Sequence, residues 1–114
     1  MINIIVKLRA IYIFLVPDGP PLNVTIYVIG NTSLFITWEP PAENKRNGKI
    51  VNYTICIKQS EDFPCVGNFS TEDQSLRIND LKAATMYYIR VLASTRVGRG
   101  TYSEKQMAKT NTCT

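Results

Sequence analysis

Residues 33–41 read SLFITWEPP, and this stretch decides the fold class. Leu34, Ile36 and Trp38 recur at every second position, so their side chains fall on one face of an extended chain. Two prolines close the stretch, because proline has no N–H to donate to a strand ladder. The pattern predicts a β-strand with one buried face, and Trp38 is best explained as the centre of the core.

The same period of two recurs outward in both directions from this strand, interrupted by turn residues about every 8–12 positions. Asn47-Gly48 is one such interruption and is a strong turn dipeptide. We expect seven strands with no convincing helical period between them: 22–28, 34–38, 52–58, a short strand around 64–69, 76–78, 87–93 and 101–110. Short strands at this spacing predict an all-β sandwich.

Composition narrows the possible functions. The chain has 114 residues, enough for one domain, and its 45% hydrophobic residues can build a core. It contains no histidine, which excludes Ser/His/Asp and Cys/His nucleophile pairs and imidazole metal ligands. The neighbouring carboxylates (Glu61 with Asp62, Glu72 with Asp73) are interpreted as solvated turn residues. We therefore expect no enzyme, no cofactor and, at a net charge of +4 without charge blocks, no nucleic-acid partner.

The order and spacing of several fragments resemble the fibronectin type III family over nearly all of residues 17–110. The matching pieces are GPP at 19–21, SLFITWEPP, NGKIVNYTI at 47–55, LKAATMYYIRVLAST at 81–95 and VGRGTYS at 97–103. The resemblance implies a seven-stranded immunoglobulin-like sandwich, with sheets A-B-E and C′-C-F-G in the family's strand letters. It also implies a non-catalytic protein-binding or spacer module of receptors, adhesion molecules and matrix proteins.

The segment from Leu81 to Tyr87 resembles the tyrosine corner of such sandwiches. This resemblance implies that the Tyr87 hydroxyl bonds to the backbone a few residues upstream. Family members usually carry proline two residues after the leucine, where this chain has Ala83. Trp38 and Tyr53 are the expected aromatic core residues.

The ends of the chain are expected to lie outside the module, which we place at 17–110, with a short tail at 111–114. Residues 1–16 are strongly apolar but carry Lys7 and Arg9, and they are too short to span a bilayer. They fit either a signal peptide or upstream sequence left on a fragment. A membrane is expected only through a parent receptor.

Four N-x-[ST] sequons indicate a secretory, extracellular or cell-surface protein, because they exceed the number expected by chance for nine asparagines. By alternation, all four fall on outward strand positions or in turns, as a bulky glycan requires. They are Asn23, Asn31, Asn52 and Asn68.

The three cysteines are consistent with an oxidising compartment. In a hairpin centred on Ser60-Glu61, Cys56 would lie opposite Cys65 with both side chains pointing outward, and such neighbours can form a disulfide. Two free thiols are the alternative. Cys113 is left over, which suggests a partner in a neighbouring domain or an intermolecular bond.

Five cations fall in two loops that carry no sequon and that the family topology brings to one end: Lys45, Arg46, Lys49, Arg96 and Arg99. In these loops only Glu43 opposes them. This end predicts contact with an acidic protein or a sulfated glycosaminoglycan; charged loops that merely solvate the space between tandem modules are the alternative. A second candidate surface is the outward row of Tyr27, Ile29 and Phe35, which could instead be covered by the apolar N-terminal residues.

The leading functional hypothesis is an extracellular interaction or spacer module of a cell-surface receptor or adhesion protein. It would bind a protein partner or neighbouring modules in a longer chain. Two alternatives stay open, namely a purely structural linker and a soluble secreted single-domain binder.

Overall fold

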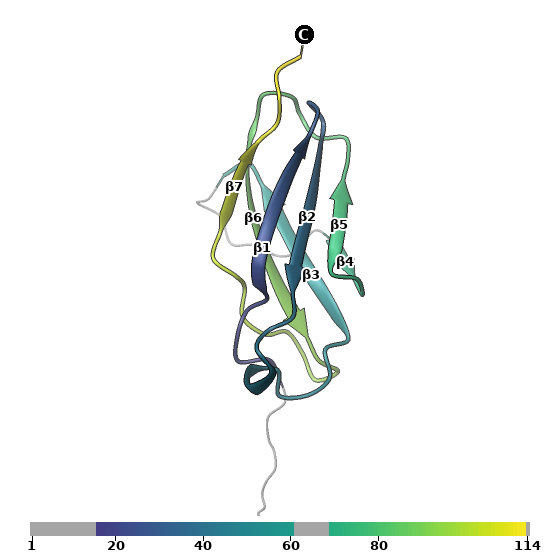
Figure 1. Ribbon diagram of the computed structural model, residues 1–114, viewed down its shortest axis with the longest axis vertical. Coiled ribbons are helices and arrows are strands. Elements are labelled where there is room, and N and C mark those ends of the chain that lie inside the picture. Colours follow the sequence, from purple (N-terminus) through teal and green to yellow (C-terminus); the bar gives the residue numbers. More distant parts are fainter. Residues whose placement is uncertain (1–15, 61–68, 114) are drawn as a thin grey trace, which may run out of the picture.

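The computed structural model describes residues 16–60 and 69–113, and these form a two-layered β-sandwich (Figure 1). One sheet has the strand order β1-β2-β5 and the other β4-β3-β6-β7. This confirms the predicted pair of sheets. The strands are β1 (Leu22–Ile29), β2 (Ser33–Glu39), β3 (Asn52–Lys58), β4 (Phe69–Thr71), β5 (Ser75–Ile78), β6 (Met86–Ser94) and β7 (Gln106–Lys109), with a short 3-10 helix η2 (Glu43–Lys45).

The core lies between the two sheets and is built from alternate residues of β2, β3 and β6. Trp38 and Tyr53 meet edge to face across it, with ring centroids 5.4 Å apart and planes inclined by 63°. Both are almost fully buried. Burial of each large core side chain contributes about 1.5–3 kcal/mol before conformational entropy is subtracted, so the predicted face of 33–41 does hold the layers together.

β1 departs from the simple alternation expected of it. Its pairing with β2 shifts register between Leu22 and Thr25, where Asn23 has a φ of 53°. A bulge of this kind re-aims the following side chains. Val24 and Ile26 pack against the core, but Leu22 and Val28 remain about two-fifths exposed.

Two predicted strands differ from the observed ones by more than one residue at an end. The last strand is shorter than 101–110, because the chain runs beside β6 without a full ladder until Gln106: the Ser103 N–H donates to the Val91 carbonyl at 2.8 Å, and the Ser103 hydroxyl accepts from the Val91 N–H at 3.0 Å. The strand expected around 64–69 begins at Phe69 as β4, and its earlier positions lie outside the described residues.

A side-chain hydrogen bond fixes the crossing between the sheets ahead of β6. The Lys82 N–H donates to the Tyr87 hydroxyl at 2.9 Å, and Leu81 packs against the core. This is the bond that a tyrosine corner makes. The turn before β6 places Ala84 at a φ of 51°, a left-handed conformation that side chains with a Cβ rarely adopt.

Part of the face of β3 and β6 turned away from the core is also buried. Thr54 pairs with Leu92 across these strands, and Cys56 pairs with Arg90. Cys56 is only 3% exposed and Leu92 only 2%. Cys56 therefore points away from the core, as expected, and is nevertheless buried.

Candidate functional site

Two loops and the start of the described chain meet at one end of the sandwich, which we call the basic end (Figure 1, at the bottom, around η2). It comprises residues 16–19, which we call the N-terminal arm, together with 40–51 and 95–100. The two loops touch, because a Cβ built on Gly48 would lie 3.5 Å from the Thr95 methyl group. The sequence predicted that these loops share one end, and the structure places them together.

Hydrogen bonds and close packing hold the N-terminal arm against both loops. The Asp18 N–H donates to the Lys45 carbonyl at 2.7 Å, and Asn47 Nδ2 donates to the Val16 carbonyl at 3.0 Å. On the other side, a Cβ built on Gly100 would come within 2.6 Å of Pro17 Cβ. Only glycine leaves room for that approach, so the packing of Pro17 on Gly100 helps to fix the position of the arm.

The predicted cations lie at this same end of the sandwich, but they differ in exposure. Lys45, Lys49, Arg96 and Arg99 are exposed. Arg46 is half-buried, and its Nε donates to the Pro41 carbonyl at 2.8 Å.

Two carboxylates, not one, oppose these cations. The exposed Asp18 lies on the arm beside η2, in addition to the exposed Glu43. Within the two loops Glu43 is the only carboxylate, as the sequence indicated, and the arm adds Asp18 from outside them. The end remains positive, with five cations against two carboxylates.

An open groove of about 320 Å³ runs from this end toward the β4–β5 turn. Arg46 and Lys49 line it beside Tyr53 and Glu72. Burial raises the pKa of the Tyr53 hydroxyl, and the positive charge of Arg46 acts in the opposite direction. The groove offers two cations and a phenol against the single carboxylate of Glu72, so its lining has a net positive charge that suits an acidic group.

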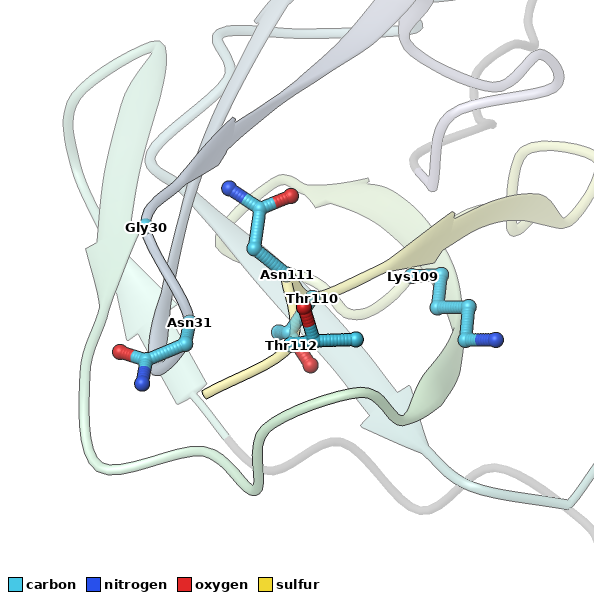
Figure 2. Close-up of a pocket in the computed structure, with 6 residues that line it drawn as sticks. All are labelled: Gly30, Asn31, Lys109, Thr110, Asn111 and Thr112. Carbon is cyan, nitrogen blue, oxygen red and sulfur yellow. The ribbon is translucent and has the colours of Figure 1, made fainter. Parts of the chain in front are cut away.

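The opposite end holds a cavity that the sequence did not point to. It measures about 740 Å³ and is lined by Gly30, Asn31 and residues 109–112 (Figure 2). The Asn111 N–H donates to the Gly30 carbonyl at 3.2 Å, and the Asn111 carbonyl accepts from the Ala84 N–H at 2.9 Å. Residues 110–113 are thus docked between two turns. We call them the C-terminal arm.

The four sequon asparagines differ in their surroundings. Asn23 is exposed on the β1 bulge, and Asn52 is half-buried at the start of β3. Asn31 is also half-buried, and its Nδ2 donates to Cys113 Sγ at 3.2 Å. Asn68 lies outside the described residues. Of the three described sites, Asn23 is fully exposed, while Asn31 in its turn and Asn52 on its strand are half-buried.

The two described cysteines occupy separate parts of the sandwich. Cys56 is buried on β3, whereas Cys113 is an exposed free thiol on the C-terminal arm. Cys65 lies outside the described residues, so the expected pairing stays a prediction. Within 16–60 and 69–113, no three His, Cys, Asp or Glu side chains gather as a metal site would require.

The outward row on the β1-β2-β5 sheet contains an aromatic pair. Tyr27 and Phe35 face each other across the strand pair, with ring centroids 6.3 Å apart. Tyr27 is 53% exposed, while Phe35 and Ile29 are half-buried. The described part of the chain contains no helix long and apolar enough to cross a bilayer.

Residues 19–108 match the fibronectin type III domain family. The chain belongs to this family. Receptor-type tyrosine-protein phosphatase F of Danio rerio is 35% identical over 95 residues, which cover 83% of this chain and 5% of the relative. Cell adhesion molecule Dscam1 of Drosophila melanogaster is 30% identical over 98 residues, covering 79% of this chain and 5% of the relative.

Solved structures give the same fold. The FN5 domain of Drosophila Lar superposes with a TM-score of 0.63 at 26% identity, covering 82% of this chain and 97% of that one. Domains A168–A170 of titin give a TM-score of 0.74 at 21% identity, covering 90% of this chain and 36% of theirs. The fibronectin type III domain is a non-catalytic module, and this chain spans about 5% of the length of the curated relatives quoted above. Those relatives are named as a receptor and a cell adhesion molecule.

Proposed function

We propose that this chain is an extracellular interaction module of a cell-surface receptor or adhesion protein, and that its basic end binds an acidic partner. The observation that carries the proposal is the gathering of five cations from two distant loops around one end. The partner is an acidic protein surface or a sulfated glycosaminoglycan, since both present dense negative charge. The names of the relatives support the receptor or adhesion setting.

The basic end is suited to docking because its backbone is held in place. The N-terminal arm is fixed by the Asp18 and Asn47 hydrogen bonds, and the two loops contact each other at Gly48 and Thr95. A preorganised surface loses less conformational entropy when a partner binds. Val97, which is 62% exposed between Arg96 and Gly98, adds an apolar contact among the charges.

Charge reversal at matched positions tests the binding role. Lys45→Glu/Arg99→Glu removes two cations from the basic end, while Lys82→Glu/Lys109→Glu makes the same net change near the C-terminal arm. We expect the first pair alone to lower the salt concentration at which the protein elutes from immobilised heparin. Arg46 is left intact because its bond to the Pro41 carbonyl supports the loop. Equal shifts in elution salt for both pairs would show that only net charge matters and would contradict specific binding at the basic end.

Extracellular placement carries two further proposals, glycosylation and a Cys56–Cys65 disulfide. We propose glycans at Asn23, Asn31, Asn52 and Asn68. An endoglycosidase should shift the secreted protein on a gel, and Thr25→Ala should remove the share carried by Asn23. In denatured, oxidised protein we expect only the Cys113 thiol to react; reaction of all three before reduction would rule the bridge out.

A purely structural linker is the second candidate, and the solved titin kinase structure with its flanking domains, 26% identical with a TM-score of 0.73, favours it. Such a linker requires neither glycans nor a charge-dependent partner. Absence of both in the two assays above would support it over the receptor module. The third candidate is a secreted single-domain binder. It would have residues 1–16 as a leader, 17–110 as the module and 111–114 as a tail. N-terminal sequencing of secreted protein would test this candidate.

A further inference from the structure

The Asn47-Gly48 pair occupies an irregular stretch between η2 and β3. Asn47 has a φ of 54° and Gly48 a φ of 139°, both outside the range that most side chains adopt. Asn47 is half-buried and Gly48 is exposed. Of the nine asparagines in the chain, Asn47 alone is followed by glycine.

The two residues have different hydrogen-bonding roles. The Asn47 side-chain amide donates to the Val16 carbonyl at 3.0 Å and so ties the N-terminal arm to the loop. The Gly48 N–H donates to no acceptor within the described part of the chain. The arm is therefore held by the Asn47 side-chain amide, and the backbone N–H of the next residue, Gly48, makes no hydrogen bond within the described residues.

We propose that Asn47 is a site of spontaneous deamidation, and that its conversion releases the N-terminal arm. The Gly48 nitrogen gives up its proton and attacks Asn47 Cγ, forming a new N–C bond. The Cγ–Nδ2 bond then breaks, and ammonia leaves with the proton. Water opens the resulting five-membered imide to aspartate or isoaspartate. No oxidant or cofactor takes part in these steps.

Three features of this loop favour the reaction. Gly48 has no Cβ, so its nitrogen can approach the side chain of the preceding residue without a steric clash. Its exposure gives water and base access to the N–H. Lys45, Arg46 and Lys49 lie on either side in the sequence, and nearby positive charge favours the ionised form of an acidic group.

The product cannot replace the amide. A carboxylate accepts hydrogen bonds but donates none, so it cannot bond to the Val16 carbonyl. Two acceptor oxygens would instead face each other. Of the two hydrogen bonds that hold the arm to the 40–51 loop, only that from Asp18 to the Lys45 carbonyl would remain. The conversion also places a negative charge among the cations of the basic end.

A matched pair of variants separates charge from the lost bond. Asn47→Asp mimics the converted protein, while Asn44→Asp adds the same charge in the same loop, on the exposed face of η2, without touching the arm. We expect the Asp18 amide to exchange with deuterium roughly tenfold faster in Asn47→Asp than in Asn44→Asp, because one net hydrogen bond is lost. Equal exchange in the two variants would overturn the release of the arm.

Ageing the unmodified protein tests the chemistry itself. After incubation in mildly alkaline buffer, peptide mapping by mass spectrometry should find the modified residue at Asn47, at least ten times more often than at Asn44. Enzymatic methylation of isoaspartate should label the same peptide. If Asn47 converts no faster than Asn44, the site assignment is wrong, whatever the variants show.

Discussion

Replacing Ala84 with glycine should make this module more stable, although it removes a methyl group. Ala84 has a φ of 51° in the turn ahead of β6. Within the described ranges, the other non-glycine residues with positive φ are Asn23, Asn47 and Asp80, types that tolerate this conformation through local hydrogen bonds. Alanine has no such compensation.

The magnitude follows from two opposing terms. An L-residue with a Cβ loses about 1–2 kcal/mol in the left-handed region, and glycine loses about 0.5–1 kcal/mol more conformational entropy on folding than alanine does. The Ala84 side chain is exposed, so the methyl group contributes little burial. We expect Ala84→Gly to raise the free energy of unfolding by about 0.5–1 kcal/mol, which corresponds to roughly 2–8 °C in Tm.

Urea denaturation of the two neighbouring variants tests the reasoning. Ala83 lies in the same turn but has no positive φ. Ala83→Gly therefore pays only the entropic term, and its free energy of unfolding should fall by about 0.5–1 kcal/mol. Opposite signs at adjacent positions are the expected result. A fall for Ala84→Gly would refute the claim that backbone strain resides at this position.

Three other substitutions test separate parts of the structure. Tyr87→Phe removes the acceptor of the Lys82 N–H and should cost about 1–2 kcal/mol in urea denaturation. Gly100→Ala brings a methyl group against Pro17 and should cost about 1–3 kcal/mol. Tyr53 has a raised pKa, so its unfolded form ionises first, near the ordinary value of 10.0. The contribution of neutral Tyr53 to the free energy of unfolding is thus present below that pH and lost above it. Tyr53→Phe should therefore lessen the fall in stability at alkaline pH.

Each of these substitutions has a matched control. Tyr88→Phe alters the neighbouring β6 residue without touching the corner, and its effect should be smaller than that of Tyr87→Phe. Gly98→Ala meets Val16 at 3.3 Å, a milder contact than the one at Gly100. Tyr27→Phe, at a residue that is 53% exposed, should change the urea stability less than Tyr53→Phe does. A larger effect in any control than in its partner would contradict the corresponding account.

The layers and the core were predictable because they rest on local alternation. Leu34, Ile36 and Trp38 share one face wherever the strand lies, so the sandwich needed only the period of two and the turn residues. The hydrogen bond between the Tyr87 hydroxyl and the Lys82 backbone was also predictable from the sequence, since its two partners are a short, fixed distance apart along the chain.

The composition of the two ends was not predictable in the same way. The packing of Pro17 on Gly100 and the bond between Asn111 and Gly30 join residues far apart in the sequence. No periodicity connects such positions, because the contacts arise only once the sheets have assembled. For this reason the two loops alone did not give the full charge of the basic end, since the arm adds Asp18.

The alternation of residues along β3 also did not predict that side chains on the outer face of the sheet would be buried. Cys56 and Thr54 occupy positions that alternation assigns away from the core, and the structure keeps that direction. Alternation gives the direction of a side chain but not what covers it. The outward direction of Cys56 was therefore predictable, whereas its burial was not.

The two arms lie at opposite ends of the sandwich, which determines how the module responds to tension (Figure 1). A pulling force applied through both ends reaches the Asn47–Val16 and Asn111–Gly30 bonds before it reaches any strand ladder. These bonds would open singly, whereas the ladders that hold the terminal strands, β1 to β2 and β7 to β6, would each have to shear as a unit. In single-molecule pulling, the module should lengthen slightly at low force before it unfolds, and Asn47→Asp should shorten the low-force phase at the N-terminal end.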